Sequence, residues 1–100
     1  TFKVGQLVRI THGRERNQVA VIIEIIDDRY VLLADGDKRK YDRPKRKNVN
    51  HFEKTPFISS EVRESLLETG RVSNGKLRFV VAKKEHEVVT DLKKGDGDSV

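Results

Sequence analysis

One segment limits the possible folds more than any other: residues 19–26 (VAVIIEII), which hold Val or Ile at six of eight positions. β-branched side chains are stiff at χ1 and favour strands over helices. Residues 4–10 (VGQLVRI) and 30–34 (YVLLA) have a similar character, and we predict strands there too. The strands at 19–26 and 30–34, joined by a short acidic turn, are expected to form a hairpin. Short strands, tight turns and no helix within about 50 residues predict a mainly β fold, a small antiparallel barrel or sandwich.

The predicted core of this domain is small. Charged residues make up 37 % of the 100-residue chain and apolar residues only 35 %. The expected core side chains are Val4, Leu7, Val8, Ile10, Val19, Val21, Ile23, Ile25 or Ile26, Val31 and Leu33. A core of this size is marginal, and a helical segment that covers an open sheet edge would stabilise it.

The second half of the chain has helix signals. Ser59 and Ser60 precede Glu61 in the pattern of a helix N-terminus, and Gly70 is placed to end that helix. Residues 72–84 can be read in two ways. Asn74-Gly75 is a hairpin signal, whereas the apolar positions that follow fit a helical stripe, and we favour a second short helix. We therefore expect a barrel with a basic stretch over residues 1–52, a helical extension over 53–90 and a disordered tail over 91–100.

The positive charge is concentrated in one place. The net charge is +5, and residues 1–50 hold twelve Lys/Arg against seven Asp/Glu, whereas the second half is balanced. Residues 38–47 (KRKYDRPKRK) alone carry seven basic residues and one acid. A polyanion would neutralise these charges and release its counterions, which drives association. Tyr41 within this stretch can either contact bases or face inward as a strand residue, and both readings stay open.

Several classes of protein are not expected. No stretch of about 18 uncharged apolar residues could span a membrane, and the first residues (TFKVG) lack the apolar core of a secretion signal. The absence of cysteine excludes disulfides, thiolate metal sites and thiol nucleophiles. The remaining class is a small basic protein of the cytoplasm.

Residues 4–36 resemble a KOW domain, the SH3-like barrel found in many ribosomal proteins and in transcription elongation factors. The resemblance depends on Val4-Gly5-x-x-Val8, on the basic turn that begins at Gly13, and on the strand 19–26 that leads into YVLLADG. It is closest to the KOW-containing large-subunit ribosomal proteins of archaea and eukaryotes and to short bacterial KOW proteins. A KOW turn usually has a second Gly four residues after the first, where this chain has Asn17, which tolerates the left-handed conformation better than other non-Gly residues.

This resemblance implies RNA binding through the loops and outer face of the barrel. We expect structured RNA, above all ribosomal RNA, as the partner, together with ribosomal or elongation-factor proteins. By position, the implied RNA-binding residues are Thr11, His12, Arg14 and Arg16 in the first loop, and Lys38, Arg39, Lys40, Arg43, Lys45, Arg46 and Lys47 in the basic stretch. Arginine suits these positions because its planar fork matches phosphate and guanine edges.

No catalytic site is predicted. His12, His51 and His86 are far apart in sequence and lack metal-ligand spacing, so neither a metal nor a cofactor is expected. A tight turn explains Asp35 and Asp37 on either side of Gly36. The chain is therefore expected not to be an enzyme. The alternative to RNA binding is a protein-interaction module of the transcription or translation machinery, in which strand edges and exposed apolar residues meet a protein.

Overall fold

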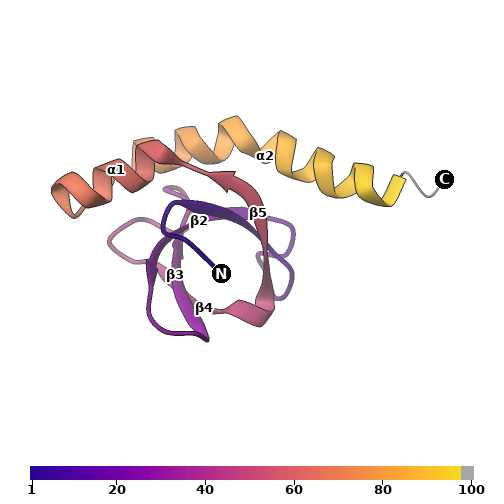
Figure 1. Cartoon of the computed structure of the whole chain (residues 1–100), viewed down its shortest axis with the longest axis horizontal. Helices are drawn as coiled ribbons and strands as arrows, with labels where there is room; N and C mark the ends of the chain where they lie inside the picture. Colours follow the sequence, from indigo (N-terminus) through magenta and orange to yellow (C-terminus); the bar gives the residue numbers. More distant parts are fainter. Residues whose placement is uncertain (98–100) are drawn as a thin grey trace.

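The protein is a curled five-stranded sheet with two helices packed along one side. The computed structural model describes the backbone of residues 1–97 and the side chains of residues 1–85 and 87. The elements are, in chain order, β1 (Gln6–Ile10), β2 (Val19–Ile25), β3 (Tyr30–Ala34), β4 (Lys45–Asn48), the 3₁₀ turn η1 (Val49–His51), β5 (Phe52–Ile58), α1 (Ser60–Thr69) and α2 (Asn74–Gly97). Neighbouring strands are antiparallel in the order β4-β3-β2-β1-β5, and Figure 1 shows the sheet bent into a ring. The predicted barrel-like β domain with a helical C-terminal region is confirmed.

Strand β2 is buried on both faces of the sheet, which explains why its sequence does not alternate. Ile22 faces the barrel interior, whereas its neighbour Val21 faces the helices. We call the interior cluster the inner core: Val8, Ile10, Ala20, Ile22, Val31, Leu33 and Phe52. We call the cluster under the helices the outer core: Leu7, Val19, Val21, Ile23, Ala34, Val62, Val72, Leu77 and Val80. A strand covered on both sides is expected to read as a continuous apolar run.

The far end of β2 differs from the prediction. The register shifts between Ile22 and Glu24, which indicates a bulge in the pairing with β3. Beyond the bulge, Ile25 and Ile26 are 41 % and 44 % exposed, so the expectation that one of them joins the core is wrong. Val4 is only half-buried. Val4 and Ile25 line an open groove beside α1, which leaves both of them partly accessible to solvent.

Strand β5 was not predicted, and it lies where a helical extension was expected to begin. It pairs with β1 from Gln6–Ile58 to Ile10–Phe52, so the sheet extends to Ile58 rather than ending near residue 52. The charged residues and Pro56 of this segment are not typical of a strand, so the sequence did not predict one. Proline is tolerated here because β5 is an edge strand. Buried hydrogen bonds fix the pairing: the Thr55 hydroxyl donates to the Leu7 carbonyl over 2.7 Å, and the Gln6 side-chain amide donates to the Thr55 carbonyl over 2.9 Å.

Both helices begin at serine caps. The Ser59 side chain accepts a hydrogen bond from the Val62 N–H, and Gly70 ends α1 in the left-handed conformation, as predicted. The Ser73 hydroxyl accepts from the Lys76 N–H, so Asn74-Gly75 opens a helix and not a hairpin.

Helix α2 is longer than predicted. It continues through Gly97, although a glycine within a helix costs about 1 kcal/mol. Residues 91–97 are therefore helical, contrary to the expected disorder, and the rest of the predicted tail, 98–100, lies outside the described residues. In the described part of the chain, neither helix has the length and apolar content needed to cross a membrane.

Candidate nucleic-acid interface

The first candidate segment is the loop between β1 and β2. Asn17 adopts a left-handed backbone with φ of 73°, as the sequence suggested for this replacement of a second Gly. Its N–H donates to the Ile10 carbonyl over 2.7 Å, and its side-chain oxygen accepts from Arg9 Nη1 over 2.6 Å. Arg14 and Arg16 are exposed at the tip of the loop, and neither forms an ion pair with any described residue. The loop is therefore held at its base and presents two arginines to solvent.

The second candidate segment is the long loop between β3 and β4. The Asp35 carboxylate accepts hydrogen bonds from the backbone N–H groups of Asp37 and Arg39, both over 2.9 Å. This carboxylate therefore orders the start of the basic stretch. Lys38 and Lys40 are exposed on either side of the half-buried Arg39. Strand β4 is short and begins only at Lys45, so most of the basic stretch is loop.

The structure brings these two loops together around Glu15. Arg39 Nη2 lies 3.7 Å from Glu15 Oε1. Burial would raise the pKa of the Glu15 carboxyl, but a hydrogen bond from its own backbone and the charges of Lys47, Lys45 and Arg39 outweigh burial and lower the pKa. We call five cations the basic edge: two that flank Glu15 in the first loop and three that line a hollow together with it, namely Arg14, Arg16, Lys38, Arg39 and Lys45. One acid and several cations form a surface that suits a polyanion.

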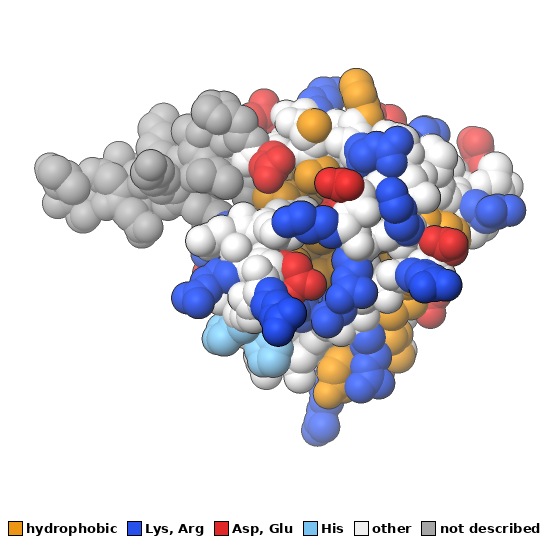
Figure 2. Space-filling model, turned by 180° about the vertical axis from the view of Figure 1, so that it is seen from behind, with side chains coloured by type: hydrophobic (Ala, Val, Ile, Leu, Met, Phe, Trp, Pro, Cys, Tyr) orange, Lys and Arg blue, Asp and Glu red, His pale blue; other side chains and the backbone are white. Residues whose placement is uncertain are grey.

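Figure 2 shows Lys and Arg side chains spread across one face of the molecule, with only scattered acids among them and histidines at its margin. Lys40 and Arg43 lie further along the β3–β4 loop, where the Arg43 N–H donates to the Lys40 carbonyl over 3.1 Å. Both are exposed and could extend the basic edge.

The last three basic residues of the stretch point in different directions. In the β3–β4 register, Lys45 and Lys47 lie opposite Leu33 and Val31 of the inner core, so both are on the interior face of the sheet. Lys45 lies at the rim of this face, half-buried in a hollow that it shares with Glu15 and Arg39. Lys47 is only 7 % exposed, and a Cβ at Gly13 would lie 4.0 Å from its Nζ. Its aliphatic chain is packed, and its charge lies beneath the first loop. Arg46 is on the opposite face, 4.4 Å above the ring of Tyr30, apart from the basic edge.

Tyr41 is turned inward, which settles the two readings of this residue. Its backbone N–H donates to the Asn74 side chain over 2.7 Å, and its hydroxyl donates to the Gly70 carbonyl over 2.9 Å. The side chain therefore ties the β3–β4 loop to the junction of α1 and α2. It packs against the outer core from a loop position rather than from a strand.

A histidine pair lies at the base of the first loop. The rings of His12 and His51 have their centroids 5.0 Å apart, although the two residues are far apart in sequence. Thr11 connects them: its N–H donates to the His51 carbonyl over 2.9 Å, and its hydroxyl lies 2.8 Å from His12 Nδ1. His51 was not among the residues predicted to bind RNA, since its place beside Thr11 depends on the pairing of Phe52 in β5 with Ile10 in β1. Within the described residues, no cluster of three or more His, Asp or Glu forms a metal site.

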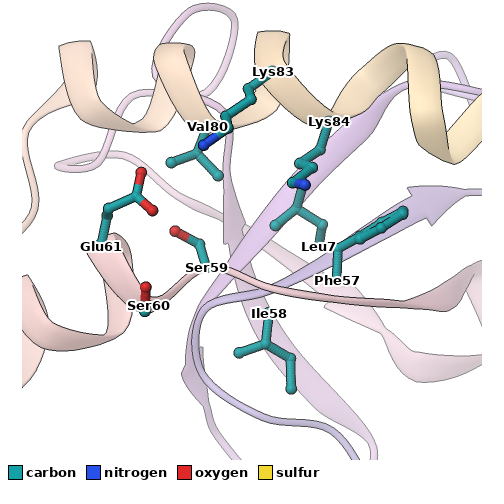
Figure 3. A pocket seen from close by; sticks show the side chains of 9 residues that line it. All are labelled: Leu7, Phe57, Ile58, Ser59, Ser60, Glu61, Val80, Lys83 and Lys84. Atoms are coloured by element: carbon teal, nitrogen blue, oxygen red, sulfur yellow. The ribbon is translucent and has the colours of Figure 1, made fainter.

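A cavity of about 200 Å³ lies where β5 meets α1, beneath α2. Figure 3 shows Lys83 and Lys84 extending down from α2, with Lys84 directed toward Leu7 and Phe57 of the sheet. Lys84 Nζ lies 5.1 Å from the Phe57 ring and 3.1 Å from a Glu87 oxygen, so its charge is already partnered. The nine lining residues include neither a histidine nor a nucleophile paired with a base, so the cavity is a packing junction between elements.

A small curled sheet with a turn at Gly13 and a basic edge beside it defines a KOW-type protein. No protein-family profile matches the chain. The chain is 38 % identical over 71 residues to "Putative ribosome-binding protein YbzG" of Bacillus subtilis. The alignment covers 71 % of this chain and 96 % of that protein. It is also 36 % identical over 77 residues to large ribosomal subunit protein eL14 of Hyperthermus butylicus. That alignment covers 69 % of this chain and 79 % of the relative. The match to eL14 of Pyrobaculum neutrophilum is 38 % over 52 residues and covers half of each chain.

The chain belongs to the family of KOW-domain ribosomal and ribosome-binding proteins, as its sequence suggested. These relatives are not enzymes, in agreement with the expectation from the sequence.

Proposed function

We propose that this protein is a ribosome-associated RNA-binding protein of the cytoplasm, which docks on structured ribosomal RNA through the basic edge. The observation that carries the proposal is the meeting of two basic loops around Glu15, with Arg39 and Lys45 on one side and the first loop on the other. Segments more than 20 residues apart in sequence form one cationic surface there. The names of the relatives, which are ribosomal or ribosome-binding proteins, support the same partner.

The geometry favours recognition of shape and phosphate over single-stranded bases. Stacking platforms for single strands need several exposed aromatic rings. Tyr41 points inward, and Tyr30 is covered by Arg46. The exposed His12–His51 pair, whose rings are tilted by 33°, offers only one small aromatic surface at the margin of the basic edge. A folded RNA that presents phosphates to Arg14, Arg16 and Lys38 is therefore the expected ligand.

The test is binding to purified large ribosomal subunits of Bacillus subtilis over a salt series. We compare the native chain with Arg14→Ala/Arg16→Ala and with the control Arg71→Ala/Lys76→Ala, which removes the same charge from an exposed site near the start of α2. The first variant should weaken binding and reduce the slope of log K against log salt by about 0.7–0.9 for each lost phosphate contact. The control should change the slope little. Equal losses in both variants, or none in either, would contradict the proposal.

A further inference from the structure

A second concave surface lies at the opposite end of β2 from the basic edge. It is a groove of about 650 Å³ between α1, the far end of β2 and the start of the chain. Its apolar lining consists of Val4, Ile23, Ile25, Tyr41, Leu66 and Leu67. Gln18 and Val19, at the near end of β2, border the basic loops. Because a strand rises about 3.3 Å per residue, the two ends of β2 are about 20 Å apart. The groove is therefore a separate surface.

The groove runs along a part of β2 that has no strand on one side. The β1–β2 ladder ends at the Leu7–Val21 pair, followed by one hydrogen bond of 2.7 Å from the Gly5 N–H to the Ile22 carbonyl. The β2–β3 ladder continues on the other side to Ile25. Within the described chain, residues 23–25 of β2 therefore have a strand partner on one side only. An unpaired strand edge is a template for another extended chain.

The start of the chain lines the groove through Lys3 and Val4, but in the described structure it does not pair with this edge as a strand. The Gln6 N–H donates to the Lys3 carbonyl over 3.0 Å, which closes a tight turn just before β1. The residues before the turn lead to the end of the barrel, where the rings of Phe2 and Phe52 lie 5.2 Å apart. Packing in the inner core thus keeps the first residues away from a continued pairing with β2.

Exposed apolar side chains gather at the same place. Leu67 of α1 is 76 % exposed, the largest fraction among the exposed large apolar residues of the described chain. Ile25 also lines the groove, and Ile26 follows it directly. Burial of these side chains by a partner would be favourable at about 25 cal/mol per Å² of apolar surface. An RNA backbone would gain nothing from this lining, whereas a peptide side chain would.

The charges at the groove indicate the chemistry of the occupant. Lys3 and Arg63 line it from the start of the chain and from α1, and Glu24 is the one acid among the lining residues. An acidic side chain between the two cations would complement them. The edge, the apolar lining and the cations together select an extended peptide that alternates apolar and acidic residues.

We propose that this groove binds an extended acidic–apolar segment of a partner protein, which adds as a strand beside residues 23–25 of β2 and buries its apolar side chains against Leu66 and Leu67. The segment pairs through its backbone and places a carboxylate near Lys3 and Arg63. Strand addition of this kind draws affinity from the main chain and specificity from side-chain pockets. The site goes beyond the proposed RNA function, and it would let one small chain join an RNA to a protein.

The test uses a synthetic heptapeptide of alternating Glu and Val with blocked ends, titrated into the full ¹⁵N-labelled chain. We expect chemical-shift changes at residues 23–26 and in α1, and slower amide exchange along that edge of β2. A peptide of alternating Lys and Val should bind at least about tenfold more weakly. An absence of shifts at about 1 mM acidic peptide, or equal binding of the basic peptide, would overturn the proposal.

Two variants separate this site from the RNA site. Leu67→Glu places a charge in the groove at an exposed position, so folding should be preserved, and peptide binding should fall by about tenfold or more. Phe79→Glu is the matched control, because Phe79 is also exposed, at 60 %, and does not line the groove. If both variants bind the peptide equally, the groove is not the site. Ribosome binding of Leu67→Glu over the salt series reports the RNA function separately, so either proposal can fail alone.

Discussion

At the residue scale, Glu15 is the least expected member of the candidate interface. It is an acid at the centre of a surface that is otherwise cationic, and its carboxylate is within 3.7 Å of Arg39. It neutralises part of the charge that a phosphate would meet, and it holds the two loops against each other. Glu15 therefore helps to keep the two loops together and lowers the positive electrostatic potential of the surface.

Replacement of this acid should strengthen RNA binding. Glu15→Gln keeps the size of the side chain, removes a negative charge and leaves Arg39 available for phosphate. A surface charge interaction of about 0.5–1 kcal/mol corresponds to a gain of about two- to fivefold in affinity. Filter binding to a large-subunit RNA at low salt measures the change, and Glu53→Gln, an exposed acid paired with Arg9, is the control. Weaker binding of Glu15→Gln would show that the order of the loop matters more than its charge.

The same carboxylate predicts a dependence of stability on pH. The folded pKa of Glu15 lies below the ordinary value of 4.5. A depressed carboxyl pKa adds stability above the unfolded value, and this stability is lost as the pH falls through the folded pKa. Urea denaturation between pH 6 and about pH 3 should show a smaller acid-side loss for Glu15→Gln than for the native chain. Parallel curves for the two proteins would contradict the assigned ion pair.

Gly36 connects the β3–β4 loop to α2. It is buried with φ of +80°, and a Cβ there would meet the Asn74 carbonyl and lie 2.9 Å from the Leu77 Cβ. Gly36→Ala should therefore cost about 2–4 kcal/mol in the free energy of unfolding, from backbone strain and crowding together. Gly75→Ala is the opposite case, because only the end of the Arg78 side chain lies nearby, at 3.7 Å. It should be neutral or stabilising by up to about 1 kcal/mol in chemical denaturation.

At the element scale, the elements with strong local signals were predictable. Residues 19–26 and 30–34 have one reading, since β-branched runs between turn residues form strands. The caps of α1 were also visible, because Ser59 and Gly70 stand at its two ends. Strand β5 was not predictable, because a proline and several charged residues argue against a strand. They are compatible with an edge strand, but the sequence does not show that β5 pairs with β1 at the edge of the sheet.

The start of α1 offers a direct test of these local signals. Ser59 is buried at 8 % exposure and caps the Val62 N–H, so Ser59→Ala should lower the free energy of unfolding by about 1–2 kcal/mol. The exposed neighbour Ser60 makes no described side-chain hydrogen bond, and Ser60→Ala should change stability by less than about 0.5 kcal/mol. Urea midpoints of the two variants give the comparison. Equal midpoints would mean that packing against the outer core, and not the cap, defines the start of α1.

At the scale of the whole molecule, the candidate surface could be foreseen in composition but not in arrangement. The sequence showed that residues 38–47 are basic. It could not show that Lys45 and Lys47 lie on the interior face of the sheet while Arg46 lies on the other face, because that depends on the register of β4 against β3. The contact of Glu15 with Arg39 and that of His12 with His51 also join residues distant in sequence, so they depend on the tertiary fold.

The sharing of β2 between the two cores has a consequence for how the chain folds as it is made. The strands leave the ribosome before the helices, since synthesis runs from the N-terminus. Until residues 60–80 have emerged, Leu7, Val21 and Ile23 of the outer core are exposed to solvent. The nascent barrel then carries an apolar stripe on its outer surface. The helices arrive last and close that stripe. A nascent chain halted after β5 should therefore adhere to chaperones or to other chains, and one released with Val62, Leu77 and Val80 in place should not.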